Sequence, residues 1–426
     1  MKKRMYLLHA HATRRNVGDD AIVLAIHSLA REVFPERDVR FCDVSRDAPV
    51  PGEPVDRTIP LYHYHHPRHW KSLLGALRRA DALLIGGGEL LAGGIEFLGL
   101  GLLGWSAGIP VVFSGVGVDL GRASTLNRAY TTFVARRARI FIARDDEAAA
   151  ELLQLGVPAD RIEVAPDLVL GLPVPELPAR PDPQPPRIGV SLRPPQHPLY
   201  PVGLPELRKV ASLLDRLVET RNASIVLLPL LDPSAPFAPS SPFATDREVL
   251  LRMAELMEHR DRVTLYSGSL HPHAVLEVLA GLHGLIAMRL HAAILGLQAG
   301  LAPLAIEYAP KTRRALNRLG LGHRVVRFAE LDAPGTADRV LSNQVDPALI
   351  ARLSREARQH FSRLREPLMQ GRRGSPLLRF PLTVGALLAH WMITLYAALP
   401  SFRVFRTRRR ALATAPAQTR DAIATS

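Results

Sequence analysis

The residues best suited to chemistry lie between 287 and 311, in the stretch AMRLHAAILGLQAGLAPLAIEYAPK. One apolar run ends at Arg289, His291 opens a segment of small residues, and Lys311 follows a second apolar run. Two fixed cations suit a doubly charged anionic substrate, and an imidazole suits proton transfer near neutral pH. We interpret the three residues as the centre of such a site, the alternative being an incidental basic cluster.

Two further arginines follow apolar runs in the same way. Arg193 comes just after the run in GVSLRP, residues 189–194, and Arg144 ends the run in RIFIARD, residues 139–145. A guanidinium in such a place can bind a carboxylate or a phosphate through two hydrogen bonds. We expect both side chains to bind substrate, with Arg193 the stronger candidate.

Three carboxylates lie near expected junctions between loops and regular elements: Asp19, Asp167 and Asp246. A carboxylate at such a junction can serve as a general base or as a helix cap. The sequence does not rank them, so all three stay candidates for the catalytic base.

Glycines mark the remaining candidate positions. Gly18, in NVGDDAI, lets the chain turn into a helix whose N-terminus can hold an anion, with Asp19 or Asp20 as its expected cap. Two other apolar runs end in glycine: Gly86, Gly87 and Gly88 in the first, Gly115 in the second. Glycine there allows a ligand to approach the backbone, and tight turns are the alternative.

Nothing in the composition predicts a metal or a cofactor. The single cysteine, Cys42, excludes an intrachain disulfide and a zinc site built on cysteines. Four histidines between residues 63 and 69 have neither ordered ligand spacing nor a nearby carboxylate, so a solvated loop is the better interpretation.

The sequence patterns of the elements that must position these side chains predict an α/β fold. Their strand-like runs are continuously apolar, which is typical of parallel strands covered on both faces. Helical patterns separate them, which predicts doubly wound, Rossmann-like architecture. The runs are 5–10, 81–87, 110–117, 139–145, 187–192, 224–230, 284–289 and 302–308.

A proline-rich stretch divides the chain. Residues 171–186 hold seven prolines and predict a stiff linker between domains at 1–170 and 187–345. Ligands of open α/β sheets bind at the carboxyl ends of the strands, so we expect the site in a cleft between the domains. A helix is expected over 346–370.

The C-terminal part is basic and apolar. Residues 371–426 carry nine arginines and one acid, and 382–399 hold no charge. Arginines on both sides of an uncharged segment favour a helix on an anionic leaflet, so 371–410, with its basic residues 372–410, is expected to associate with a membrane. A helix packed on the protein is the alternative. Residues 411–426 predict a disordered tail.

Localisation and partners follow from the same features. No export signal is recognisable at the start, so we expect a cytoplasmic protein, peripheral or monotopic at the inner face of the cytoplasmic membrane. Nucleic acid is not an expected partner, because the basic tail adjoins an apolar helix rather than interleaved aromatic residues.

Taken in order, the motifs resemble the polysaccharide pyruvyl transferase family over roughly residues 5–320. The motifs are NVGDDAI, IGGGEL, SGVG, ARDDEAAAELLQLG, APDLVL, GVSLRP, ATDREVL and MRLHAAILGLQAG with PLAIEYAPK. The resemblance implies two Rossmann-like domains arranged as in GT-B glycosyltransferases. It also implies transfer of a pyruvyl group from phosphoenolpyruvate to two hydroxyls of a sugar, with release of phosphate.

The resemblance further implies that Arg193, Arg289 and His291 hold the donor and assist proton transfer. The acceptor would be a cell-surface polysaccharide or its lipid-linked precursor. Residues 91–105, LAGGIEFLGLGLLGW, depart from the family pattern where an acceptor or a lid is expected. Two other functions stay open: a GT-B-like glycosyltransferase using a nucleotide-sugar, and a non-catalytic, membrane-tethered component of polysaccharide assembly.

Overall fold

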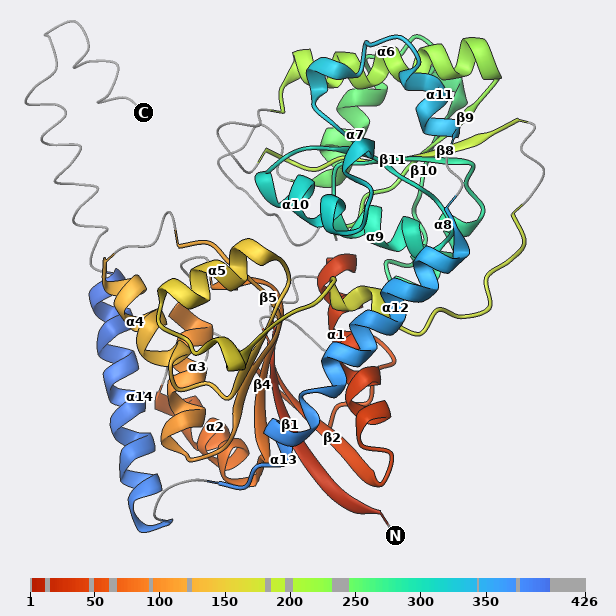
Figure 1. Cartoon of the computed structure of the whole chain (residues 1–426). Coiled ribbons are helices and arrows are strands. Elements are labelled where there is room, and N and C mark those ends of the chain that lie inside the picture. Colours follow the sequence, from red (N-terminus) through yellow and green to blue (C-terminus); the bar gives the residue numbers. More distant parts are fainter. Residues whose placement is uncertain are drawn as a thin grey trace, which may run out of the picture.

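The computed structural model shows two α/β domains, one above the other in Figure 1, followed by helices that return to the first domain. The described residues are 2–11, 16–45, 50–60, 67–91, 95–120, 125–180, 185–195, 202–231, 245–342, 345–372 and 376–398. The four histidines between residues 63 and 69 and the tail after residue 398 therefore lie outside the side chains that are described.

The N-terminal sheet is parallel, with the strand order β3-β2-β1-β4-β5-β6-β7. All eight residues of β5 are buried, which explains why its sequence carries no charge. The order reverses between β1 and β4, the place where Rossmann-like sheets bind ligands. The strands are β1 (Lys3–Ala10), β2 (Arg37–Ser45), β3 (Arg57–Pro60), β4 (Ala82–Leu91), β5 (Val111–Val118), β6 (Ile140–Ala143) and β7 (Ile162–Val164).

The helices of this domain connect these strands. They are α1 (Val17–Val33), α2 (Pro67–Arg79), α3 (Ile95–Ser106), α4 (Thr125–Ala135) and α5 (Asp146–Gln154), with short 3-10 turns at η2 (Ala159–Arg161) and η3 (Leu168–Gly171).

The C-terminal sheet is also parallel, with the order β10-β9-β8-β11-β12-β13. Its switch point lies between β8 and β11. The strands are β8 (Arg187–Ser191), β9 (Ser224–Leu227), β10 (Val263–Leu265), β11 (Gly284–Ala287), β12 (Leu304–Ile306) and β13 (Val325–Val326). The helices are α6 (Leu204–Arg221), α7 (Asp246–Ala254), α8 (Pro272–Ala280), α9 (Leu290–Gln298), α10 (Pro310–Arg318) and α11 (Thr336–Leu341). The predicted pair of Rossmann-like domains is confirmed.

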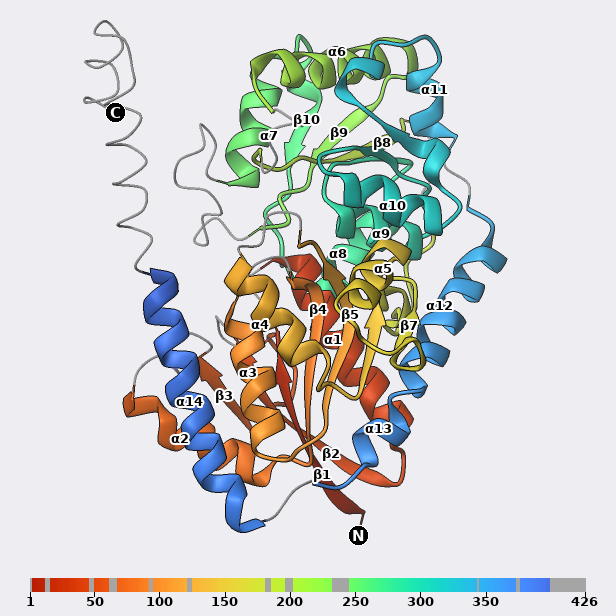
Figure 2. The ribbon, with the colours of Figure 1, turned by 60° about the vertical axis from the view of Figure 1, so that its left-hand side comes forward.

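The single helix expected over 346–370 is two helices, α12 (Pro347–Ser362) and α13 (Arg365–Met369). The chain turns between them at residues 363–364, and Leu364 is buried in the core at that turn. α12 packs on η3 and α1, so it leads the chain from the second domain back to the first (Figure 2).

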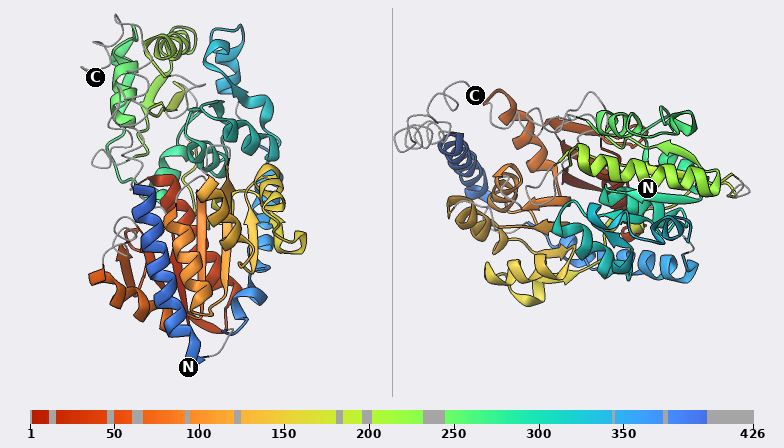
Figure 3. Two further views of the ribbon diagram at one scale, coloured as in Figure 1. Left: turned by 90° about the vertical axis from the view of Figure 1, so that its left-hand side faces the viewer. Right: turned by 90° about the horizontal axis from the view of Figure 1, so that it is seen from above.

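The last described helix, α14 (Pro376–Ala398), packs along α3 on the N-terminal domain (Figure 3, left, blue). Thr383, Leu387 and His390 are buried in this contact, and the Tyr130 hydroxyl lies 2.8 Å from His390 Nδ1. The alternative of a helix packed on the protein is therefore what the structure shows. None of the described helices is long and apolar enough to cross a membrane.

Arg372 was expected to face a membrane, and the structure gives it another contact. Its guanidinium donates to the carbonyls of Leu77, Arg78 and Ala80 at 2.7–2.8 Å, at the carboxyl end of α2. These carbonyls have no partner within their own helix, so a cation is stabilising there. Arg372 thus holds the start of the C-terminal segment to the first domain.

Residues 95–106 form the helix α3. Phe97, Leu98, Leu100, Leu102 and Leu103 belong to the core of the N-terminal domain, and Trp105 is exposed. A contact of this stretch with an acceptor stays a prediction. Its glycines allow close packing: an added Cβ would lie 2.6 Å from Val134 at Gly101 and 2.7 Å from Leu83 at Gly104. The glycine-rich sequence therefore reflects helix packing.

The two domains contact each other directly. One cluster of buried apolar side chains contains residues of both domains and of α12 and α13. Gln298 Nε2 in α9 donates to the Val169 carbonyl in η3 at 2.9 Å. Val17 N donates to the Leu230 carbonyl at 3.0 Å, and Asn16 forms a β-bridge with Leu231.

Candidate functional site

The candidate residues lie where the carboxyl ends of the two sheets meet. The bridge between Asn16 and Leu231 joins the residues that precede α1 to those that follow β9. Arg144 follows β6, Arg193 follows β8, and Arg289 follows β11. Both switch points therefore face the same seam, as the sequence patterns predicted. The seam is the contact between the two domains at the carboxyl ends of their sheets, near Asn16 and Leu231.

The N-terminus of α1 is capped by Asn16, not by Asp19 or Asp20 as expected. Asn16 Oδ1 accepts a hydrogen bond from Gly18 N at 3.2 Å, and Asn16 Nδ2 donates to Asp19 Oδ2 at 3.2 Å. The amide supplies both an acceptor and a donor, which a carboxylate cannot do. Asp19 is therefore held in the first turn, half-buried beside the seam.

Gly18 is required by the position of His291. A Cβ added at Gly18 would lie 2.2 Å from His291 Nδ1, far inside van der Waals contact. The imidazole of the C-terminal domain therefore rests against the backbone of the N-terminal domain. Gly18 acts on the site by making room for His291.

His291 forms a polar pair with Asp167 across the seam. His291 lies in the first turn of α9, and its Nε2 is 3.4 Å from Asp167 Oδ2. Asp167 also caps η3, because its side chain accepts from Val169 N at 3.1 Å. The two expectations for Asp167, cap and functional carboxylate, are both compatible with this position.

Asp167 is held ionised although it is buried. Burial raises the pKa of the carboxyl, but the neighbouring His291 and Arg144 and the Val169 N–H outweigh it and hold the pKa below its ordinary value. Arg144 itself is buried, and its Nε has no hydrogen-bond partner among the described residues.

Arg289 is fixed by Asp246. Its Nε and Nη2 donate to the two carboxylate oxygens of Asp246, each at 2.5 Å, in a buried two-pronged pair. Asp246 also accepts from Leu230 N at 3.1 Å, while the neighbouring Thr245 caps α7. Asp246 is therefore placed to orient Arg289, and its role as a base stays a prediction.

Tyr308 is a site residue that the sequence analysis missed. It is buried just after β12, with the Arg193 guanidinium carbon 4.6 Å and Lys311 Nζ 5.7 Å from the centre of its ring. Burial raises the pKa of the phenol, but Lys311, Arg193, Arg289 and Arg144 outweigh it and lower the pKa below its ordinary value. Its position at the end of an apolar run was the available signal.

The glycines of β4 and β5 mainly serve packing. An added Cβ would lie 2.6 Å from Ile26 at Gly86 and 2.0 Å from Ile22 at Gly87, so both let α1 approach the sheet. Gly115 has a φ of +65° and lies against Leu168 of η3. Gly88 has a φ of +89° and no atom within 4 Å of an added Cβ. Direct ligand contact by these glycines stays a prediction.

Four cations around a buried phenol, with an imidazole and a carboxylate paired nearby, are groups that can bind an anion and transfer a proton. A sequence model of one family, polysaccharide pyruvyl transferase, matches residues 16–310 of this chain. The chain belongs to the polysaccharide pyruvyl transferase family. The matched range contains every candidate residue except Lys311.

Solved structures show the same fold with little sequence likeness to this family member. The UDP-GlcNAc 2-epimerase of Methanocaldococcus jannaschii matches with a TM-score of 0.55 and 10% identity, over 84% of this chain and 99% of that chain. The enzyme of Neisseria meningitidis, solved with UDP-GlcNAc, matches with a TM-score of 0.53 and 12% identity over the same shares. These likenesses show a GT-B-like fold. No curated protein matches the chain.

Proposed function

We propose that the protein transfers a pyruvyl group from phosphoenolpyruvate to two hydroxyls of a sugar, forming a cyclic ketal and releasing phosphate. The acceptor would be a cell-surface polysaccharide or its lipid-linked precursor. The family supports a transferase of this kind. The observation that carries the donor is the group of Arg144, Arg193, Arg289 and Lys311 around Tyr308.

The donor needs at least two cationic contacts, one for its phosphate and one for its carboxylate. Nε and Nη2 of Arg289 donate to Asp246, so Nη1 is the guanidinium nitrogen that would contact a ligand. Arg193, whose guanidinium carbon lies 4.6 Å from the centre of the Tyr308 ring, supplies a second guanidinium. No additional cofactor enters this scheme.

The proton balance of the reaction shows that an acid is needed, and His291 is the proposed acid. The two attacking hydroxyls lose two protons in all, one of which ends on the methylene carbon of the donor while the other leaves with the phosphate. His291 would deliver the proton that makes the ketal carbon electrophilic, and Asp167, 3.4 Å away, would orient the ring and stabilise its charged form.

Among the three candidate bases, Asp19 fits best. The oxygens of Asp246 are engaged by Arg289 and the Leu230 N–H, and Asp167 is engaged by His291 and the Val169 N–H. Asp19 also accepts a hydrogen bond, from Asn16 Nδ2 at 3.2 Å, but it is half-buried beside the same seam, whereas Asp167 and Asp246 are buried. It would accept a proton from an acceptor hydroxyl.

The direct test measures phosphate released from phosphoenolpyruvate in the presence of pyruvylatable saccharides, with the ketal product identified by NMR. His291→Asn should lower kcat by about 10²–10⁴ with the melting temperature retained. The matched control is His323→Asn, because His323 is exposed and precedes β13, at the amino end of a strand, whereas the candidate residues follow the carboxyl ends of strands. Wild-type protein that binds a UDP-sugar but neither binds nor consumes phosphoenolpyruvate would refute the proposal and favour a glycosyltransferase.

We also propose that α14 contacts an anionic membrane from its outer side. Its exposed apolar residues are Phe380, Leu382, Leu388 and Met392, with exposed fractions of 46–60%. Leu388→Ser with Met392→Ser should reduce co-sedimentation with vesicles that contain anionic lipid while leaving the melting temperature unchanged. Equal co-sedimentation of the double variant and the wild type would remove this role from α14.

A further inference from the structure

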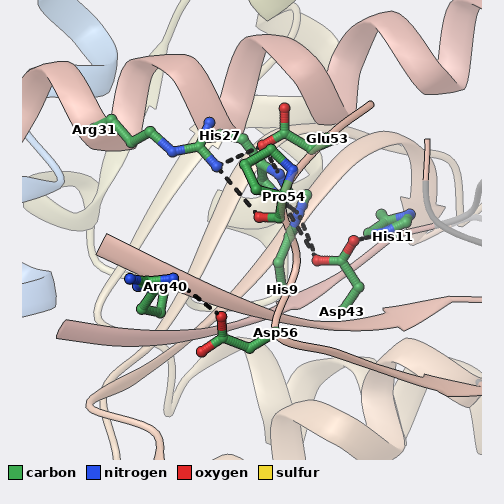
Figure 4. Close-up of polar contacts among 9 residues, drawn as sticks. All are labelled: His9, His11, His27, Arg31, Arg40, Asp43, Glu53, Pro54 and Asp56. Atoms are coloured by element: carbon green, nitrogen blue, oxygen red, sulfur yellow. Dashed lines mark hydrogen bonds and ion pairs between the residues drawn. The ribbon is translucent and has the colours of Figure 1, made fainter. Parts of the chain in front are cut away.

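A second group of titratable side chains lies outside the seam residues described above, between α1 and the strands β1 and β2 (Figure 4). His9 and Asp43 are paired in the register of β1 and β2, so they are neighbours on adjacent strands. His11 comes two residues after His9, which places it on the same face of the sheet. His27 reaches the group from α1. All four side chains are buried.

The distances within this group are short. His11 Nε2 lies 3.2 Å from Asp43 Oδ2, and His9 Nδ1 lies 4.0 Å from Asp43 Oδ1. His27 Nε2 lies 2.9 Å from His9 Nδ1 and 3.4 Å from Asp43 Oδ1. One ligand atom from each of His9, His11 and Asp43 can be chosen so that all three lie within 4.8 Å of one another.

The group leaves polar atoms unsatisfied in the protein alone. Among the described residues, His9 Nε2, both ring nitrogens of His11 and both oxygens of Asp43 have no well-aligned hydrogen bond. Burying such groups without hydrogen-bond partners is unfavourable. Their unused lone pairs can bind a cation.

The surrounding residues match what a metal site needs. His27 Nδ1 lies 2.9 Å from Glu53 Oε1, and Arg31 donates to the same oxygen at 2.6 Å. A carboxylate behind a histidine fixes its ring and its tautomer, as is usual around metal ligands. Imidazole with carboxylate suits zinc and neighbouring transition metals, whereas calcium and magnesium prefer oxygen alone.

We propose that His9, His11 and Asp43 bind one divalent transition-metal ion, with His27 as the adjoining fourth ligand, oriented by Glu53. Around zinc, ligand atoms lie about 3.4 Å apart, given bonds of about 2.0–2.1 Å. His11 Nε2 and Asp43 Oδ2 are already close to this separation, at 3.2 Å. The ion fastens β1, β2 and α1 to one another at the carboxyl end of β1.

The test uses the full-length chain with all four histidines of residues 63–69 changed to alanine, so that they cannot supply ligands. This protein is stripped with a chelator and titrated with Zn²⁺ against a chromophoric competitor. We expect one equivalent to bind and to raise the melting temperature. His11→Ala and Asp43→Asn should each weaken binding by at least about 100-fold, and Glu53→Gln by about 10–100-fold. The matched control, His323→Ala, should bind as the parent does.

The visible absorption of bound Co²⁺ tests the site in the parent protein, without substituting any proposed ligand residue. Four-coordinate Co²⁺ absorbs visible light much more strongly than the hydrated ion, so the parent protein should develop this absorption at one equivalent and lose it on adding Zn²⁺. A folded parent that shows no such absorption and no Zn²⁺ binding overturns the proposal. So does binding whose affinity is the same in folded His11→Ala and Asp43→Asn.

Discussion

At the residue scale, Gly18 decides how closely the two domains can meet at the proposed acid. The neighbouring imidazole lies in the volume that any larger side chain would need. A ring displaced by about 1 Å loses its alignment with the donor, which alone can cost about 100-fold in rate.

Gly18→Ala should therefore lower kcat by about 100-fold while changing the free energy of unfolding much less, since the clash moves a side chain at a seam. Steady-state kinetics and a thermal melt measure the two effects. Gly75→Ala in α2 is the control, because an added Cβ there meets nothing within 4 Å. It should leave kcat unchanged and raise stability by up to about 1 kcal/mol. Full activity in Gly18→Ala would contradict the position of His291.

Asp167 should make stability depend on pH. Its pKa is below the ordinary value, so the carboxylate contributes stability above the unfolded pKa of about 3.9 and loses it as the pH falls through the folded pKa. The difference in unfolding free energy between wild type and Asp167→Asn should thus shrink as the pH falls below about 4. Urea melts across acidic pH measure it.

The control for this titration is Asp160→Asn, since Asp160 is exposed in η2. Asp160→Asn should change the unfolding free energy by no more than about 0.5 kcal/mol. A difference for Asp167→Asn that stays constant with pH would show that the pair with His291 does not favour the carboxylate.

Much of the site could be predicted from residue types at the ends of apolar runs, because parallel strands deliver those positions to one edge. Arg144, Arg193 and Arg289 were found in this way. Asn16 was missed as the cap because Asp19 and Asp20 are equally good capping types, and only the contact with Gly18 N separates them. The pairing of Asp246 with Arg289 joins residues 43 positions apart, which no local pattern reports.

At the element scale, the contact between α14 and α3 explains the sequences of both helices. α3 is largely apolar and rich in glycine, so burial of its face away from the sheet is favourable. α14 provides that cover, and the His390 ring fills the space beside Gly99, where an added Cβ would lie 2.4 Å away. The uncharged part of α14, from residue 382 on, thus has a packing role in addition to the proposed contact with lipid.

Gly99→Ala should loosen α14, because the new methyl group and the His390 ring cannot occupy the same space. We expect faster amide hydrogen exchange across residues 376–398, measured by mass spectrometry. Gly385→Ala lies in α14 itself, where an added Cβ meets nothing within 4 Å, and it should leave exchange unchanged or slower. Unchanged exchange in Gly99→Ala would mean that α14 is not held by this contact.

Two of the elements that the sequence analysis did not predict, β2 and α3, depend on tertiary contacts. β2 alternates polar and apolar residues and contains Asp43, so it lacks the continuous apolar run of the central strands. α3 has glycines at positions where helices normally carry side chains, which lowers its helical propensity until neighbouring elements surround it. In both cases the tertiary contacts determine the element.

At the scale of the whole molecule, the apolar core does not stop at the domain boundary. Phe361 of α12 is fully buried in the cluster that also holds side chains of α1 and α9. Cooperative unfolding follows when the same core stabilises both parts.

Denaturant unfolding should accordingly show one transition. The three tryptophans, Trp70, Trp105 and Trp391, lie in α2, α3 and α14, so fluorescence reports on the N-terminal domain and its added helix. Far-ultraviolet circular dichroism reports on both domains. The two midpoints should coincide. Phe361→Ala should lower both together, because it should reduce the free energy of unfolding by about 3–5 kcal/mol. Separate midpoints would show that the domains unfold independently.

The backbone bonds between residues 16–17 and 230–231 have a mechanical consequence. They connect the two domains beside His291. Any opening of the domains that keeps these bonds must therefore be a hinge rotation about this point. The gap gained is then smallest at the proposed acid and grows toward the outer rim. A ligand could then enter from the outer rim while the residues beside His291 keep their contacts.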